Sequence, residues 1–341
     1  MKRWQTLLIG ILVSALALFL AYRQADFVEM FSAVQQARLL YVVIAIPLIT
    51  LLTLVRGLRW SILTEARITP WDGFWLFNIG FLFNNILPAR LGEIARASLA
   101  SRRPTIHFTS ALSSIVVERL FDMVCVVALF GMVLLSMDLP GWAAGAGSVM
   151  GVGAVTGLIA LALAARFPEG ALRLGARILA VLPRISYDQA HTFLKPFVDG
   201  LGGVAHIRTF AIGFGLSLVA WIMSGAVGWL LLLAFVPGAP IMAGMLAIAG
   251  AGLGFSVPAA PSGVGPYHAA VIGVLTAVGF NADVSRSYAF VLHASNFLMT
   301  SLLGIIGLVR EGVTFREVAA QARSLREAQP ATPNLTDEHP V

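Results

Sequence analysis

The sequence predicts an all-α protein: a polytopic membrane helix bundle with about six full spans and two broken or re-entrant helical hairpins. Hydrophobic residues make up 58% of the 341 residues and charged residues only 12%, about half the charged fraction of an ordinary soluble domain. The mean hydropathy is +0.86, so lipid is the expected main solvent. A motif that interrupts two apolar stretches is the third observation, and it predicts an inverted-topology repeat.

Full spans are expected where about 20 mostly apolar residues follow one another. The apolar stretch at the N-terminus resembles a signal peptide, but no convincing cleavage site follows Ala21, so we expect it to remain as the first span. The predicted spans are residues 6–22, 39–55, 110–136, 142–165, 210–236 and 287–309. Segments 74–87 and 241–278 are predicted to form the broken hairpins. If both pieces of the second hairpin cross fully, the chain has eight spans instead.

The positive charges predict the orientation. With a cytoplasmic N-terminus, 19 of the 23 Lys and Arg residues fall in cytoplasmic segments, as the positive-inside rule requires. Both termini are therefore expected in the cytoplasm, with the first hairpin entering from the cytoplasm and the second from outside. Because the basic residues lie in loops between apolar spans, the isoelectric point near 10.1 does not indicate a nucleic-acid partner.

The repeated motif is the most informative local feature. Segment 87–93 (LPARLGE) is echoed 173 residues later by segment 260–266 (APSGVGP). Broken backbone at membrane depth is tolerated only where protein or a water-filled cavity satisfies the freed peptide groups. Matching breaks in two halves are a pointer to the central site of a transporter. We therefore expect the functional site where the two breaks meet.

The domain organisation follows from these patterns. Residues 1–310 are predicted to form one integral membrane domain, with halves of about 1–140 and 141–310. Between them, residues 167–208 are either a basic amphipathic helix on the inner leaflet or a simple connector. Residues 311–341 are expected to be a polar cytoplasmic tail with a disordered end.

Three ionisable residues lie inside the predicted span 110–136: Glu118, Arg119 and Asp122. A charge near the bilayer centre costs about 2.5–3.5 kcal/mol on insertion scales. Glu118 and Asp122 share a helix face, and Arg119 can pair with Asp122. These groups are either a structural ion pair that locks neighbouring helices or a polar floor for a lipid head group, with a proton-coupling carboxylate as a variant of the second reading.

Charged residues also follow the first break. Glu93 and Arg96 lie at a helix N-terminus, where free N–H groups favour an anion such as phosphate. Arg96 and Arg90 are candidate partners for that anion. Ordinary cytoplasmic anchoring is the alternative for Arg90, and a structural role is an equal alternative for Arg96. Arg56 and Arg59 are expected to snorkel toward the cytoplasmic surface.

The second break carries neutral polar residues. Gly263 and Gly265 permit unusual backbone angles, and Ser262 can cap the helix that follows. His268 is a candidate titrating group or a structural histidine. His293 and Asn296 in the last span either complete the polar interior or tie helices together.

Several chemistries are not indicated. The sequence has no phosphate-binding P-loop, no H-E-x-x-H motif, no G-x-S-x-G elbow and no metal-ligand cluster. Its one cysteine, Cys125, excludes an intramolecular disulfide and a cysteine-rich metal site. We expect no cofactor and no metal, and any transport must use a gradient, the membrane potential or downhill exchange.

Three ordered motifs resemble a known family. Segments 84–93 (NNILPARLGE), 116–122 (VVERLFD) and 261–265 (PSGVG) are similar to the flippase-like family that includes the transmembrane region of lysylphosphatidylglycerol synthetases, the multiple peptide resistance factors. The resemblance covers residues 7–309 and implies movement of a phospholipid or polyprenyl-linked lipid between leaflets by a bundle that can dimerise. Carried over by motif, the candidate residues are Arg90, Glu93, Arg96, Glu118, Arg119 and Asp122. The soluble aminoacyl-transferase domain is missing, so aminoacylation of phosphatidylglycerol is not expected of this chain alone.

The sequence and the resemblance together predict a lipid translocase of the bacterial inner membrane that is not an enzyme. Its expected partners are membrane lipids, a second copy of the chain, and a glycosyltransferase or lipid-modifying enzyme. One alternative is a non-transporting, lipid-binding partner subunit of such an enzyme. A second alternative is an intramembrane lipid-modifying enzyme in which Glu118 or His268 supplies the acid or base.

Overall fold

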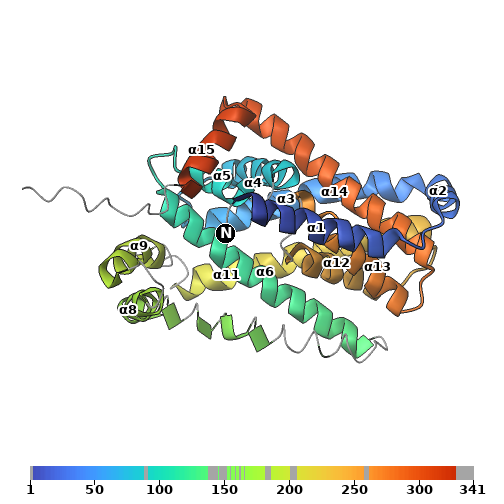
Figure 1. Cartoon of the computed structure of the whole chain (residues 1–341), viewed down its shortest axis with the longest axis horizontal. Coiled ribbons are helices and arrows are strands. Elements are labelled where there is room, and N and C mark those ends of the chain that lie inside the picture. The colour runs from blue at the N-terminus through green and yellow to red at the C-terminus, as the bar shows by residue number, and fades with distance from the viewer. Residues whose placement is uncertain are drawn as a thin grey trace, which may run out of the picture.

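The computed structural model describes residues 3–87, 91–136, 145, 152–153, 155–157, 159–160, 163–164, 166–180, 186–199, 206–256 and 261–327. Over these residues the chain is helical and contains no strand, which confirms the all-α class (Figure 1). The helices are α1 (Arg3–Tyr22), α2 (Phe27–Gln36), α3 (Leu39–Leu63), α4 (Pro70–Ile86), α5 (Leu91–Ala100), α6 (Phe108–Ser136), α8 (Pro168–Leu179), α9 (Tyr187–Asp199), α11 (Ile207–Phe235), α12 (Ile241–Ser256), η1 (Pro261–Gly263), α13 (Pro266–Ala277), α14 (Ala282–Glu311) and α15 (Phe315–Glu327).

Within the described ranges, three helices are both long and apolar enough to cross a membrane: α3, α11 and α14. They correspond to the predicted spans 39–55, 210–236 and 287–309. Helix α6 is 29 residues long but carries the three predicted charges. The predicted span 142–165 lies largely outside the described residues. The total of six spans therefore stays a prediction.

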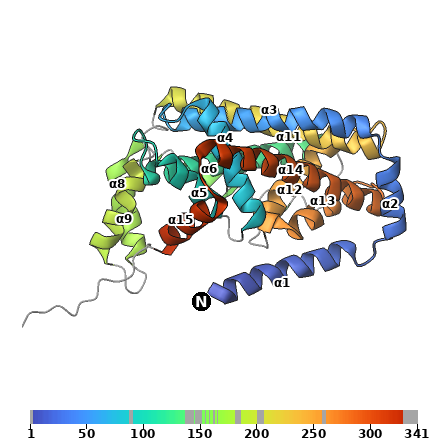
Figure 2. The ribbon, with the colours of Figure 1, turned by 90° about the horizontal axis from the view of Figure 1, so that it is seen from above.

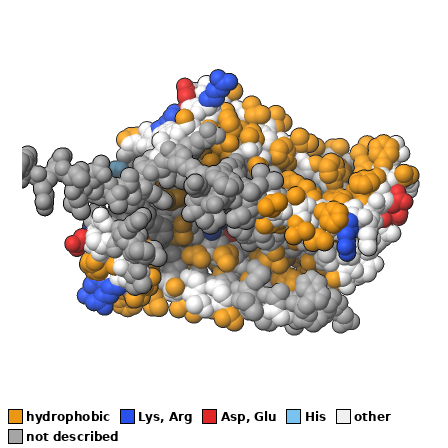
Figure 3. All heavy atoms as spheres, in the orientation of Figure 1, with side chains coloured by type: hydrophobic (Ala, Val, Ile, Leu, Met, Phe, Trp, Pro, Cys, Tyr) orange, Lys and Arg blue, Asp and Glu red, His pale blue; other side chains and the backbone are white. Residues whose placement is uncertain are grey.

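The surface of the long helices is suited to lipid. Val43 of α3, Val219 of α11 and Leu302 of α14 are all exposed, which is unfavourable in water and favourable in a bilayer. Figure 3 shows hydrophobic side chains spread over the described part of one face, with most of the charged side chains around its margin. The chain is a membrane-spanning protein.

The helices are arranged around a central group. Helices α3 and α11 run alongside each other on one side of the molecule, and α1 runs along the opposite side (Figure 2). Helices α4, α6, α12, α13 and α14 lie between these sides. Figures 1 and 2 place α2 at one end of the long axis and α8 and α9 at the other.

Two series of four helices have the same order of lengths. Helices α3 to α6 have 25, 17, 10 and 29 residues, and helices α11 to α14 have 29, 16, 12 and 30. A pair of glycines sixteen residues apart joins the first two helices of each series: Gly57 with Gly73, and Gly228 with Gly244. A Cβ on Gly73 would collide with the Gly57 carbonyl, so these helices approach closely only because the side chains are absent.

Each series contains a break between its second and third helix. In the first, the Asn84 side-chain Oδ1 accepts the Gly92 backbone N–H at 2.9 Å and bridges the gap. In the second, Ser262 has a φ of 59° and Gly265 a φ of 101°, as expected for a glycine-dependent turn. The expectation that Ser262 caps α13 is wrong, because Gly265 is the N-cap residue and makes no side-chain cap bond.

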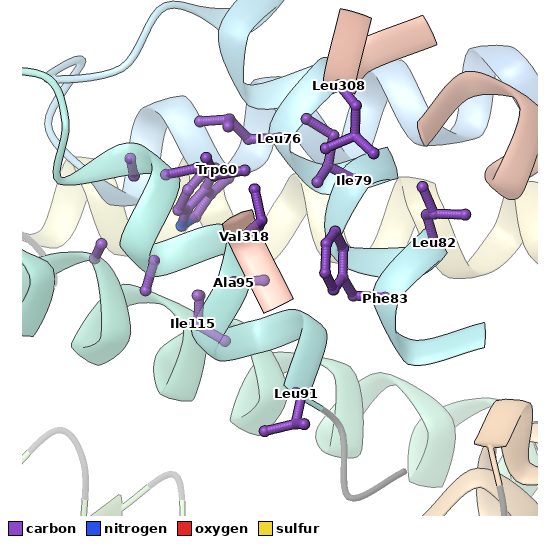
Figure 4. Close-up of a cluster of buried hydrophobic side chains, with 14 of the residues drawn as sticks. Trp60, Leu76, Ile79, Leu82, Phe83, Leu91, Ala95, Ile115, Leu308 and Val318 are labelled. Atoms are coloured by element: carbon purple, nitrogen blue, oxygen red, sulfur yellow. The ribbon is translucent and has the colours of Figure 1, made fainter. Parts of the chain in front are cut away.

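The tail and the connector differ from the sequence expectation. Residues 315–327 form α15 and pack on α5, where Val318 points in among Trp60, Ile79 and Phe83 (Figure 4). Because the rest of the tail is polar, its sequence pattern does not reveal that one face of α15 is buried. The disordered end expected over 329–341 lies outside the described residues. The described residues of the connector form two helices, α8 and α9, which pack on each other. Helix α2 is an additional exposed helix outside the predicted elements.

Candidate functional site

Arg59 of α3 is the centre of a buried ionic network. It has no exposed surface, and its Nη2 lies 2.5 Å from Glu118 Oε1. Its Nη1 contacts Asp122 Oδ1 at 2.6 Å and donates to the Ser217 hydroxyl at 2.9 Å. The expectation that Arg59 snorkels is wrong, because two carboxylates one helical turn apart on α6 hold the guanidinium inside the bundle.

Arg96 of α5 is the second partner of Glu118. Its Nη2 lies 2.7 Å from Glu118 Oε2, so each carboxylate oxygen of Glu118 has one close arginine partner. The Arg96 guanidinium lies 3.7 Å from the centroid of the Trp60 ring, and the Trp60 indole N–H donates to the Ser114 hydroxyl at 2.9 Å. The stacked ring fixes the plane of the guanidinium, which a lysine cannot reproduce.

Arg119 forms the accessible edge of the network. Its side chain is 36% exposed, and it lies 3.5 Å from Glu118, 3.7 Å from Asp122 and 3.6 Å from Glu93. Because all three contacts are long, the Arg119 guanidinium interacts weakly with three carboxylates at once. On the other side, the Trp221 indole N–H donates to Asp122 Oδ1 at 3.0 Å. The predicted pairing of Arg119 with Asp122 is confirmed.

The network has more cations than anions. Arg56, half-buried on α3, donates only to the Ser224 hydroxyl at 3.3 Å and has no carboxylate within ion-pair distance among the described residues. Four arginines (Arg56, Arg59, Arg96, Arg119) therefore face three carboxylates (Glu93, Glu118, Asp122). Each of the four keeps a buried Nε atom without a hydrogen-bond acceptor in the described part of the chain. Buried donors without hydrogen-bond partners require an explanation. The Nε of Arg119 is a partial exception, because it lies 3.6 Å from Glu93 Oε1.

A second, neutral cluster lies where elements of the two breaks meet. The Ser262 hydroxyl lies 2.7 Å from His293 Nε2 and 3.4 Å from Asn85 Oδ1. The Asn85 amide nitrogen donates to the hydroxyls of Ser301 at 2.9 Å and Thr300 at 3.2 Å. Residues of α4, η1 and α14 are thus joined through side chains.

Two imidazoles extend this neutral cluster. The rings of His268 and His293 have centroids 4.9 Å apart, and Tyr267 lies against His293 with a centroid distance of 4.6 Å. Tyr22 of α1 contacts the edge of His268 at 6.0 Å. The Nδ1 atoms of both histidines are buried and lack a hydrogen-bond partner among the described residues.

The structure divides the predicted site residues between these two clusters. The ionic network contains Glu93, Arg96, Glu118, Arg119 and Asp122, and the neutral cluster contains Ser262, His268 and His293. Gly263 and Gly265 shape the second break through their backbone. The Asn296 amide nitrogen donates to the Leu292 carbonyl of its own helix, so Asn296 joins neither cluster. Arg90 lies outside the described residues.

Sequence reasoning missed several members. Arg59, Ser217 and Trp221 were not candidates, and Asn85 entered only as part of the motif 84–93. An arginine inside a helix that is otherwise apolar was the available signal for Arg59. Ser217 and Trp221 gave no signal, since serine and tryptophan are ordinary residues of membrane helices.

Comparison with known proteins adds a family match. The model of the lysylphosphatidylglycerol synthase TM region family matches residues 7–304. The chain is 26% identical to Glycosyltransferase AglD of Haloferax volcanii over 95% of its own length and 57% of that protein. It is 25% identical to a UPF0104 membrane protein of Methanothermobacter thermautotrophicus, over 80% of this chain and 84% of that one. No solved structure matches.

The AglD comparison has unequal coverage. Nearly all of this chain aligns, but it spans little more than half of that relative. The UPF0104 protein, in contrast, is covered over most of its length. The part shared with both relatives is therefore the membrane region described above.

Proposed function

The chain belongs to the family of lysylphosphatidylglycerol synthase TM regions, and from that premise we propose that it is a transbilayer lipid translocase acting without ATP hydrolysis. Its cargo is a phospholipid or a polyprenyl- or glycolipid-type lipid with an anionic phosphate. In this proposal the protein transports and does not catalyse a covalent reaction. The observation that carries the proposal is the buried ionic network with one arginine in excess.

The network supports phosphate binding in a specific way. A lipid phosphate offers several acceptor oxygens, and arginine offers donors in a planar fork that suits them. Arg119 is the favoured first contact, because its three ion pairs are long and its side chain is partly exposed. Arg56 is the favoured second contact because a serine hydroxyl is its hydrogen-bond acceptor. A phosphate held by these two leaves the tight pairs of Arg59 undisturbed.

We further propose that halves 1–140 and 141–310 form an inverted repeat. The matched helix lengths, the equally spaced glycine pairs and the contact between Asn85 and Ser262 support this relation. Alternating access would follow from one repeat rocking against the other around a fixed site. The distribution of Lys and Arg favours cytoplasmic termini. We further propose a bacterial inner membrane as the location, membrane lipids as partners and a homodimer as the assembly.

Leaflet exchange tests the proposal. Purified protein is reconstituted in phosphatidylcholine vesicles that contain fluorescent phosphatidylglycerol, and a membrane-impermeant quencher reports how fast inner-leaflet label appears outside. Wild type is expected to exchange the label, and Arg119→Gln to slow exchange about tenfold, since one charge-assisted hydrogen bond is worth about 1.5 kcal/mol or more. Arg103→Gln is the matched control, because Arg103 pairs with Glu311 away from the network. Equal rates in vesicles with and without protein would reject the proposal.

A lipid-binding partner subunit is the alternative that one observation favours. The relative in Haloferax volcanii is named a glycosyltransferase and is longer than this chain, which is consistent with a membrane region that serves a separate catalytic unit. In that case the protein would co-purify with a glycosyltransferase and show no exchange activity of its own. The same vesicle assay therefore separates the two functions.

A further inference from the structure

We propose that the neutral cluster of Asn85, Ser262, His268 and His293 binds the hydroxyl groups of an uncharged, hydroxyl-bearing lipid head group. This inference rests on the proposed function and narrows its cargo to a lipid phosphate esterified to a polyol. Glycerol and a sugar share the relevant chemistry, which is a pair of neighbouring hydroxyls. The cluster would contact those hydroxyls while the arginines contact the phosphate.

The chemical character of the neutral cluster suits the hydroxyl groups of a polyol. Its hydrogen bonds join an amide, hydroxyls and an imidazole, and none of these groups bonds to a carboxylate or an arginine within the described part of the chain. Amides, hydroxyls and neutral imidazoles each supply donors and acceptors together. A polyol needs both, because every hydroxyl donates one hydrogen bond and accepts others.

The two histidines of the neutral cluster have unused hydrogen-bonding capacity. His268 and His293 are only 6% and 7% exposed, yet the Nδ1 atom of each has no partner among the described residues. Buried polar atoms normally have partners, and their rings lie 4.9 Å apart. Two orphan nitrogens on adjacent rings match two neighbouring hydroxyls. The Tyr267 ring against His293 adds an apolar face for the carbon side of a polyol.

The first break connects the helix that carries Asn85 of the neutral cluster with the helix that carries Glu93 and Arg96 of the ionic network. Asn85 and Glu93 lie on opposite sides of the first break, and the bond from the Gly92 N–H to Asn84 holds the two sides together. Arg96 lies one turn beyond Glu93 on α5. The hydrogen bond between Gly92 and Asn84 therefore ties the end of α4, which carries Asn85, to the start of α5, which carries Glu93 and Arg96. We infer that a lipid phosphate at the arginines has its head group directed toward the neutral cluster.

The charges around the neutral cluster disfavour a cationic lipid head group. The three carboxylates of the network, Glu93, Glu118 and Asp122, each lie within ion-pair distance of an arginine. The neutral cluster contributes no further carboxylate within the described ranges. A lysine-bearing head group would therefore bring a positive charge into a region that already has an excess of positive charge, which is unfavourable.

The test compares lipids that differ only in the head group. Vesicles of phosphatidylcholine carry fluorescent phosphatidylglycerol, or phosphatidylpropanol, which has the same carbon skeleton without the two hydroxyls. Wild type is expected to exchange phosphatidylglycerol about tenfold faster, as two hydrogen bonds of about 0.5–1.5 kcal/mol each predict. Lysylphosphatidylglycerol is expected to exchange more slowly than phosphatidylglycerol. A phosphatidylinositol arm distinguishes a ring polyol from glycerol by which of the two exchanges faster.

For each variant, the measured quantity is the exchange rate of phosphatidylglycerol divided by that of phosphatidylpropanol, rather than either rate alone. His293→Gln retains a group in the position of Nε2 for Ser262 but lacks Nδ1, so the ratio is expected to fall toward one. Ser262→Ala removes a hydroxyl partner and should act in the same direction. His107→Gln is the control, since His107 is exposed at the start of α6, and its ratio should equal that of wild type. A variant that only misfolds lowers both rates and leaves the ratio unchanged.

The outcomes separate the inference from the function beneath it. A wild-type ratio near one would overturn the inference while lipid exchange itself stands. An unchanged ratio in His293→Gln and Ser262→Ala would also overturn it when both variants unfold at the wild-type temperature, since misfolding is then ruled out as the reason. Absence of exchange for every lipid would reject the translocase function and the inference with it. A ratio that falls in both variants and not in His107→Gln supports the assignment.

Discussion

Arg59 and Glu118 form an ion pair with no exposed surface on either side chain, their Nη2 and Oε1 atoms 2.5 Å apart. The pair joins α3 to α6, and the second oxygen of Glu118 joins α6 to α5 through Arg96. Removing charges from water is costly, and such pairs persist only when the geometry and additional hydrogen bonds compensate. Three helices are therefore held in one arrangement by a single carboxylate.

The first prediction concerns that carboxylate. Glu118→Gln removes the charge that two buried guanidiniums face, so the apparent stability is expected to fall by about 3–5 kcal/mol. Thermal unfolding of the purified protein measures the loss. Glu65→Gln is the matched control, because Glu65 pairs with Arg67 where both side chains are exposed, and it should cost less than about 1 kcal/mol. Equal shifts in the two variants would contradict the structural role of Glu118.

The second prediction concerns the aromatic platform of Arg96. Arg96→Lys retains the charge but loses the planar stack on Trp60, and the expected loss is about 1–2 kcal/mol. Arg102→Lys serves as the comparison, since Arg102 is exposed and its guanidinium donates to the Gln321 side chain. An unfolding temperature for Arg96→Lys equal to that of Arg102→Lys would show that stacking contributes nothing.

The third prediction concerns the second break. Gly265→Ala places a Cβ 2.5 Å from the Ser14 carbonyl oxygen at a φ of 101°, so it combines backbone strain with a collision against α1. Gly279→Ala has a φ of 92° and no atom within 4 Å of the added carbon, so only strain of about 1–2 kcal/mol is expected there. The difference between their unfolding temperatures reports the α1 contact. No difference would mean that α1 does not pack on the break.

The fourth prediction concerns the tail helix. Val318→Asp buries a carboxylate in the apolar cluster of α4, α5 and α15 and should release α15, which limited proteolysis after residue 314 would detect. Ala320→Asp, on the exposed side of the same helix, should leave the tail protected. Equal cleavage of both variants and wild type would show that α15 is not docked through Val318.

The sequence predicted much of the fold because lipid exposure leaves a strong local pattern. Runs of apolar residues located α3, α11 and α14, and the proline and glycine motifs located both breaks. Helix α15 was missed because two buried residues, Val318 and Ala319, are too few to mark a helix within a polar segment. Helix α2 has no buried residue at all among those described, so its pattern does not distinguish it from a loop.

The sequence predicted residues of the candidate site only where several charged residues lie close together within an apolar span. Glu118, Arg119 and Asp122 lie within five residues of one span and were found for that reason. Arg59 lies 59 residues from Glu118, and its position near a helix end made snorkelling the simpler expectation. Its true partner depends on how α3 packs against α6, which no local pattern encodes. The sequence motifs predicted that the two breaks meet, but not that Asn85 and Ser262, 177 residues apart, would be the residues in contact.

The central claim is that the arginine donors without acceptors bind a lipid phosphate. Native mass spectrometry with lipid identification, on protein gently extracted from its own membrane, tests it most directly. We predict that wild type and Arg103→Gln retain an anionic phospholipid or phosphate-linked glycolipid, and that the Arg56→Gln/Arg119→Gln double variant loses it. The same lipids bound in equal amounts to all three proteins would contradict the claim.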